Sequence, residues 1–191
     1  MNPPFVVVYD ACILYSAALR DLLVRLAMTE LFQAKWTEDI HREWMDAVLK
    51  TRRPDVSASR LQRTRELMDA SVPNALVSEY ASLIDGLRLP DPDDRHVLAA
   101  AIASGAQTIV TFNLKDFPPS ALAPWGVEAQ NPDDFVIGLM DLDSAKVLQA
   151  MREQRAALTA PTVSAEHLLE TIEKQGMTLT AARLRASIPL I

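Results

Sequence analysis

Two short runs of β-branched and aromatic residues constrain the fold of this chain more than any other feature of its sequence. They are "FVVVY" at 5–9 and "TIVTF" at 108–112, and each is typical of a buried strand. Most of the sequence between them has the apolar spacing of amphipathic helices. Because parallel strands need long, usually helical crossovers, this alternation predicts an α/β fold with a mostly parallel sheet covered by helices on both faces.

Capping residues and apolar spacing predict the other elements. Helices are expected over 17–28, 37–50, 57–71, 79–87 and from about 91 to the terminator Gly105. Short strands are expected near "QAKW" (33–36), "ALVS" (75–78) and "VEAQ" (127–130). From "NPDD" (131–134) to the C-terminus the pattern is helical, with breaks at "TAPTVS" and Gly176.

The amino-acid composition excludes several kinds of site and segment. The 191 residues contain one cysteine, which excludes an internal disulfide and a cysteine-rich zinc site, and the three histidines lack paired ligand spacing. No apolar run approaches the roughly 20 residues of a membrane span. The segment "MNPPFVVVYDACIL" has no basic leader before its apolar part, so a cytoplasmic location is expected.

Polar side chains follow both of the strongest strand segments. Asp10 comes directly after the first, and Asn113 and Asp116 come after the second. Ligands of open parallel sheets bind beyond the carboxyl ends of the strands, so these side chains are expected at one edge. Each acid taken alone is equally well explained as a turn or cap residue.

The stretch "LPDPDDRHVLAAA" (89–101) places three aspartates before an apolar run. Asp91 and Asp93 suit a helix N-cap and a first-turn acid. Asp94 lies three and four residues before Val97 and Leu98, so the register points its carboxylate inward. A buried carboxylate needs a partner.

A fourth acid, Glu43, occupies the apolar stripe of the helix over 37–50, with a solvated position as the alternative. No lysine or arginine occupies an equivalent inward position. Four converging carboxylates favour a divalent cation, and hard oxygen ligands suit Mg²⁺ or Mn²⁺. Such ions support phosphodiester hydrolysis without a serine or cysteine nucleophile.

Together, "VVVYDACIL", "HREW" and "DPDDRHVLAAAIASGAQTIVTFNLKDF", in this order, resemble the PIN-domain nucleases, and among them the VapC-type toxins of prokaryotic toxin–antitoxin pairs. The resemblance covers roughly 5–131. It implies an α/β/α sandwich that cleaves RNA with Mg²⁺ or Mn²⁺ and is neutralised by a cognate antitoxin protein. It also implies a PIN nuclease domain over 1–133 and a helical C-terminal extension over 134–191, as in one toxin subgroup.

Carried over residue by residue, the resemblance assigns catalytic and metal-binding roles to Asp10, Glu43, Asp94 and Asp116. Asn113 supports them through its amide, and Asp91 is a further candidate ligand. This chain departs from the family pattern at Cys12, where many relatives have a polar residue, often asparagine. The departure bears on one hydrogen bond beside the metal site. We expect Cys12 to be a small buried residue and not a catalytic thiol.

The basic segment from Lys50 to Arg65 contrasts with a formal net charge of −6. It is the candidate RNA-binding face, represented by Arg52 and Arg53, and its alternative is a solvated helix face. His96 is expected on the solvated side of its helix.

Two competing functions are disfavoured because "VYDAC" offers a single acid after the first strand, with Cys12 two positions later. A haloacid-dehalogenase-like phosphatase needs an acid there, and a response-regulator receiver expects an adjacent acidic pair after its first strand. The alternative from another class is a PIN-like module that binds RNA or protein without cleaving. For the C-terminal extension three roles stay open: packing on the nuclease core, homodimer formation, and antitoxin binding.

Overall fold

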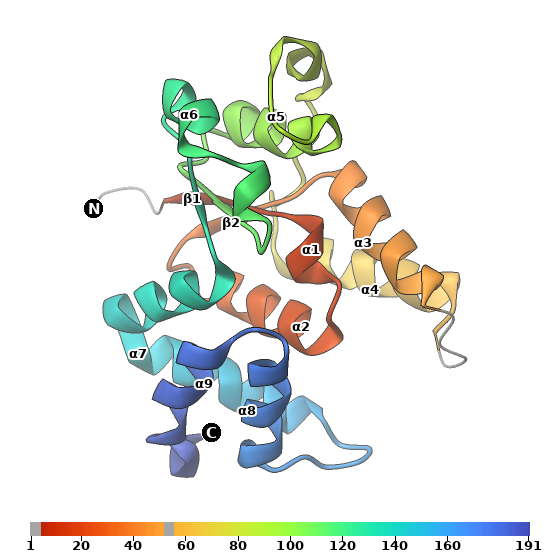
Figure 1. The fold of residues 1–191 in the computed structure, drawn as a ribbon. Coiled ribbons are helices and arrows are strands. Elements are labelled where there is room, and N and C mark those ends of the chain that lie inside the picture. Colours follow the sequence, from red (N-terminus) through yellow and green to blue (C-terminus); the bar gives the residue numbers. More distant parts are fainter. Residues whose placement is uncertain (1–4, 52–55) are drawn as a thin grey trace.

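The computed structural model describes residues 5–51 and 56–191. Its centre is a four-stranded, all-parallel sheet in the order β2-β1-β3-β4, shown in Figure 1. The strands are β1 (Val6–Tyr9), β2 (Gln33–Lys35), β3 (Thr108–Val110) and β4 (Glu128–Gln130). Val8 pairs with Lys35 on one side and with Ile109 on the other. The parallel sheet predicted from the sequence is confirmed.

The helices surround this sheet. Their bounds are α1 (Ala11–Leu14), α2 (Ala17–Ala27), α3 (Glu38–Lys50), α4 (Ala58–Ser71), α5 (Arg95–Ser104), α6 (Pro119–Leu122), α7 (Pro132–Ala157), α8 (Ala165–Lys174) and α9 (Thr178–Arg185). Short 3-10 turns occupy 81–86, 92–94, 114–116, 123–125 and 188–190. Side-chain caps begin α3 and α4 at Thr37 and Ser57, as expected. Gly105, at a φ of 66°, ends α5.

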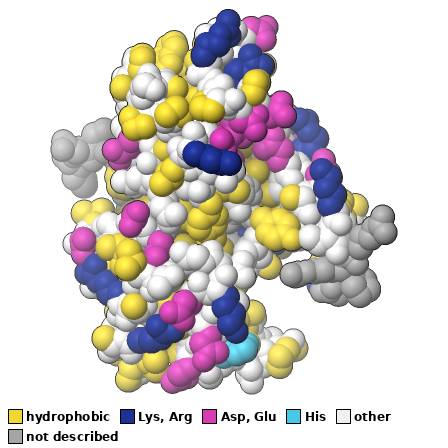
Figure 2. Space-filling model, viewed as in Figure 1, with side chains coloured by type: hydrophobic (Ala, Val, Ile, Leu, Met, Phe, Trp, Pro, Cys, Tyr) yellow, Lys and Arg dark blue, Asp and Glu magenta, His cyan; other side chains and the backbone are white. Residues whose placement is uncertain are grey.

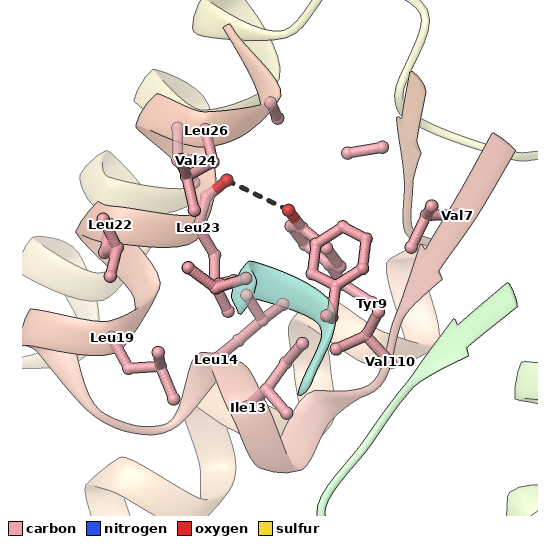
Figure 3. Close-up of a cluster of buried hydrophobic side chains, with 14 of the residues drawn as sticks. Val7, Tyr9, Ile13, Leu14, Leu19, Leu22, Leu23, Val24, Leu26 and Val110 are labelled. Atoms are coloured by element: carbon pink, nitrogen blue, oxygen red, sulfur yellow. Dashed lines mark hydrogen bonds between the residues drawn. The ribbon is translucent and has the colours of Figure 1, made fainter. Parts of the chain in front are cut away.

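The core packs both faces of the sheet. Helix α5 lies on β1 and β3 from one side. On the other side the Tyr9 hydroxyl donates to the Leu23 carbonyl of α2, at 3.1 Å, within the buried cluster of Figure 3. Phe135 of α7 packs edge-on against Phe32, with ring centroids 5.1 Å apart. The layers are those of an α/β/α sandwich.

Two expected elements differ from the structure. The segment "ALVS" forms an isolated bridge between Leu76 and Trp36, not a strand. The next residue after Trp36 is Thr37, the cap of α3, so the neighbouring strand offers no further residue to pair. The expected helix over 79–87 is a 3-10 helix over 81–86.

A short helix that the sequence did not predict, α1, follows β1. Its carbonyl end is held by Arg20, whose Nη1 donates to the Leu14 carbonyl at 2.6 Å. The Arg20 guanidinium also lies 4.4 Å from the ring centre of Trp44 in α3. Burial lowers the pKa of Arg20 to about 10, and it nonetheless stays charged near neutral pH. Arg20 thereby ties α1, α2 and α3 together behind the carboxyl end of β1.

The C-terminal helices pack on the rest of the chain. Helix α7 lies along α2, and α8 and α9 pack against each other and against α2 and α7, respectively (Figure 1). Gln154 of α7 donates to the Ala18 carbonyl at 2.7 Å, and Lys146 donates to the Thr29 carbonyl at 2.8 Å. Packing on the core is thus the role that these contacts display. Within 5–51 and 56–191, no helix combines the length and apolar character that crossing a membrane requires.

Candidate active site

Asp10 is the most deeply buried acid of the candidate site. It ends β1 and caps α1, where its Oδ1 accepts a hydrogen bond from the Ala11 N–H at 2.6 Å. Its Oδ2 accepts from the Thr111 hydroxyl at 2.7 Å and from the Cys12 thiol at 3.1 Å. Only 4% of Asp10 is exposed. Three donors from two strand ends therefore fix the orientation of this carboxylate.

The sequence reasoning missed Thr111 as a positioning residue. Its hydroxyl donates to Asp10 and also accepts the Asn113 N–H at 2.9 Å, so one side chain organises both strand ends. The available signal was a polar residue inside the apolar segment "TIVTF", directly before the turn that carries Asn113.

Cys12 occupies the position at which the chain departs from the family pattern. Burial, and then the charge of Asp10, raise the pKa of its thiol to about 12, so the thiol stays protonated and donates to Asp10. Its sulfur also accepts the Phe112 N–H at 3.3 Å. Cys12 is therefore a hydrogen-bonding group in this structure and lacks the acidity of a nucleophile.

Asp91 and Asp94 differ in role: Asp91 caps a turn, whereas the Asp94 carboxylate faces the other acids. Asp91 caps the 3-10 turn, and its Oδ1 accepts the Asp93 N–H at 2.9 Å. Asp94 stands at the N-cap of α5 but makes no capping hydrogen bond with its side chain. Burial, followed by the charges of Asp10, Asp91, Asp116 and Glu43, raises the pKa of Asp94 to about 7. These four acids thus lie close enough to Asp94 to oppose its ionisation.

Glu43 contacts His96, a residue that was expected on the solvated side of its helix. His96 is not on the solvated side of α5: it is only 7% exposed, with its Nε2 2.8 Å from Oε1 of Glu43. This contact is an ion pair when the His96 ring is protonated. Burial lowers the pKa of His96, but Glu43 outweighs it and the net shift is upward. His96 of α5 and Glu43 of α3 therefore meet between the two helices.

Asp116 and Asn113 lie on the turn after β3. Asp116 ends the 3-10 turn Leu114–Asp116 and is partly exposed, and Asn113 is exposed. Within the described residues neither side chain of these two makes a hydrogen bond or an ion pair. Asp116 nevertheless contributes to the raised pKa of Asp94, which places its carboxylate near the other acids.

These acids form an acid cluster, which we define as Asp10, Glu43, Asp91, Asp94 and Asp116. Figure 2 shows acidic side chains gathered near the upper part of the molecule and bordered by basic ones. In the described part of the chain, no lysine or arginine forms an ion pair with any member. Nor do three or more of its acids or histidines surround a single point closely enough to hold one ion.

The structure describes only part of the basic segment Lys50–Arg65. Arg52 and Arg53 lie outside the described residues. Further along, Arg63 pairs with Glu66 at 3.3 Å, and Arg65 pairs with Glu38 and, at 3.8 Å, with Asp69. These two arginines therefore match the alternative of a solvated, ion-paired helix face.

Comparisons with known proteins place the chain in a family. The model of the PIN domain matches residues 6–115, and that of the VapC50 C-terminal domain matches residues 132–186. The chain is 34% identical over 122 residues to "Putative ribonuclease VapC50" of Mycobacterium tuberculosis, an alignment that spans 62% of this chain and 72% of that protein. No solved structure matches. The chain therefore belongs to the PIN-domain family, and it is of the VapC type with a C-terminal extension.

Proposed function

We propose that this protein is an endoribonuclease that uses Mg²⁺ or Mn²⁺ and acts as a toxin neutralised by a cognate antitoxin. The observation that carries the proposal is the acid cluster itself: burial first, and then repulsion from Asp10, Asp91, Asp116 and Glu43, raises the pKa of Asp94 to about 7. Such repulsion persists in a folded protein when a bound cation relieves it in the working state. The similarity to a protein named as a ribonuclease supports RNA as the substrate.

The donor set of the acid cluster suits a hard divalent cation. It consists of carboxylate oxygens at the carboxyl ends of β1 and β3, near the middle of α3 and before the start of α5, without a lysine or arginine to neutralise them in the described residues. The ligands we propose are Asp10, Glu43, Asp94 and Asp116, with Asp91 and Asn113 as further candidates.

The chain's own residues prepare this site. Thr111 and Cys12 hold Oδ2 of Asp10, while His96 holds one oxygen of Glu43. A bound divalent ion supplies activation of water and stabilisation of the leaving oxygen of a phosphodiester. Asp94, whose pKa is raised to about 7, has to lose its proton when it becomes a ligand, so binding releases protons near neutral pH.

Substrate and partner assignments follow the same proposal. We propose single-stranded or looped RNA, since cleavage needs an accessible phosphodiester, with Arg52 and Arg53 contacting phosphates. We also propose a nuclease domain over 1–133 and a helical extension over 134–191, a division supported by two family models that match separate stretches.

The test is an assay of purified protein on total RNA with Mg²⁺, with Mn²⁺ and with a chelator. We expect cleavage only with a divalent ion. Asp10→Asn is the matched control, because it keeps the side-chain shape and removes the charge, and it excludes a contaminating nuclease. If wild type and Asp10→Asn cleave equally, the assignment of the acid cluster is wrong.

The same assay addresses the non-cleaving alternative. A PIN-like binding module would retain RNA in a gel-shift experiment while producing no cleavage with either ion. That result would replace the nuclease proposal with a binding function.

A further inference from the structure

One turn of the C-terminal extension touches the edge of the sheet that carries the acid cluster. Gly176 lies between α8 and α9 at a φ of +92°, a conformation that side chains rarely adopt. A Cβ built on Gly176 would lie 3.1 Å from Cε1 and 3.5 Å from Cζ of Phe112. At Gly105 and Gly126, which also have positive φ, an added Cβ would meet nothing within 4 Å. Gly176 therefore combines a left-handed backbone with a close approach to one aromatic ring.

Phe112 connects this turn to Asp10. Phe112 follows β3, and its backbone N–H donates to the sulfur of Cys12 at 3.3 Å. The Cys12 thiol in turn donates to Oδ2 of Asp10 at 3.1 Å. A displacement of Phe112 that moves its backbone N–H would therefore reach the carboxylate through one intermediate side chain.

The turn itself is held in place from the C-terminal side. The Met177 N–H donates to the Ile172 carbonyl at 3.1 Å, and the Met177 side chain is fully buried. Asp133 of α7 accepts the N–H groups of Leu179 and Thr180 at 2.7 and 2.8 Å, which anchors the start of α9. In Figure 1 this turn lies on the side of the C-terminal helices that faces α1.

We propose that the turn Gln175–Met177 is a positioning element of the active site. It packs against Phe112 and so keeps the Cys12 thiol at hydrogen-bond distance from Asp10. Gly176 is a positioning residue, because it acts through Phe112. The C-terminal extension thus sets the geometry of catalysis as well as covering the core. The inference rests on the proposed function only for its effect on cleavage, since the contact with Phe112 exists independently of it.

The first experiment uses Cys12 as a reporter, because it is the only cysteine of the chain. The rate of its modification by an aromatic disulfide reagent is measured in wild type, Gly176→Ala and Gly126→Ala. Gly126→Ala is the matched control, since it adds a methyl group at a φ of +67° without a neighbour. We expect Gly176→Ala to react about fivefold faster, because displacing Phe112 by a few tenths of an ångström weakens the contact between its N–H and the Cys12 sulfur. Gly126→Ala should react within about twofold of wild type.

The second experiment measures steady-state cleavage of RNA. A shift of a few tenths of an ångström at Asp10 should lower kcat about fivefold and leave KM unchanged, since Gly176 does not contact the substrate. In a Phe112→Leu background, which removes the ring atoms that Gly176 approaches, the added effect of Gly176→Ala on Cys12 should shrink to that of the control glycine.

The outcomes separate the two proposals. Equal Cys12 reactivity in Gly176→Ala and Gly126→Ala overturns the positioning role, whatever the protein cleaves. Absence of cleavage in wild type overturns the proposed function and leaves the Cys12 result to be judged alone. If Gly176→Ala does not fold, Phe112→Leu alone decides: unchanged Cys12 reactivity in that variant also overturns the role.

Discussion

At the scale of single residues, neighbouring acids of the same type meet different surroundings. Asp91 caps a turn and Asp93 is exposed, whereas Asp94 makes no cap and faces the rest of the acid cluster. Register decides this difference, because Asp94 shares the face of α5 that carries Val97 and Leu98, both fully buried. In the metal-free protein, the proposed function of Asp94 therefore opposes stability.

Asp94→Asn should stabilise the metal-free protein by about 1 kcal/mol at pH 8, a value reduced for the partial exposure of the side chain. The pKa of Asp94 is raised from 3.8 to about 7, so the native protein keeps this proton up to a higher pH than the unfolded chain does. The stability that it contributes is complete below about pH 4 and is lost as the pH rises through 7. Urea denaturation with a chelator at pH 5 and 8 measures this, and the advantage of the variant should shrink at pH 5.

The matched control is Asp93→Asn at the exposed neighbour, for which we expect little change. Adding Mg²⁺ should raise the Tm of wild type and leave that of Asp94→Asn nearly unchanged. RNA cleavage by Asp94→Asn should be at least about a hundredfold slower than cleavage by wild type. A helix-capping role would instead make Asp94→Asn neutral or destabilising, with metal response and cleavage intact.

At the scale of elements, the junction of α3 and α4 depends on a neutral histidine. Oδ1 of Asp69 accepts from Trp36 Nε1 at 2.8 Å and from His41 Nε2 at 3.0 Å, while Nδ1 of His41 accepts from Trp44 Nε1 at 3.0 Å. Since His41 accepts at one nitrogen and donates at the other, its ring is neutral. Burial lowers the pKa of His41, and Asp69 only partly offsets this.

His41 should therefore make the protein sensitive to acid. Its depressed pKa means that the unfolded chain binds the proton first, so stability is present above about pH 6.5 and is lost as the pH falls below it. His41→Gln can still donate and accept, and it should lose less stability than wild type between pH 7.5 and 5. Urea denaturation at both pH values tests this. An identical acid loss in the variant would show that another group is responsible.

At the scale of the whole molecule, the C-terminal extension completes the packing of the nuclease core. Phe135 of α7 contacts the rings of Phe5, Tyr9 and Phe32. Phe5 precedes β1, Tyr9 ends β1, and Phe32 precedes β2. Helix α7 also packs against α2. Removing the extension would expose this apolar surface to water.

A chain that ends at Asp133 should therefore aggregate or lack a cooperative unfolding transition. The milder variant Phe135→Ala should remain folded and lose about 3–5 kcal/mol, as buried aromatic truncations do. Circular dichroism and thermal melting distinguish the two, and the exposed Leu142→Ala is a control on the same helix. A truncated chain that stays folded and cleaves RNA would contradict the packing role and direct attention to antitoxin binding or dimer formation.

The sequence by itself determined the features that depend on local chemistry. The β-branched runs specified β1 and β3, and Thr37, Ser57 and Gly105 marked helix ends, because caps and left-handed glycines act over a few residues. It also placed Asp10 and Asp116 at one edge of the sheet, since parallel strands end together. The bounds of most elements follow from these signals.

Only the tertiary structure decided which side chains meet across the chain. The hydrogen bond of Thr111 to Asp10, the pairing of His96 with Glu43 and the approach of Gly176 to Phe112 each join separate elements. Periodicity states which face of a helix is buried, but it does not state which residue lies opposite. That choice depends on how α3, α5 and the α8–α9 turn pack around the sheet, and packing is a property of the whole chain.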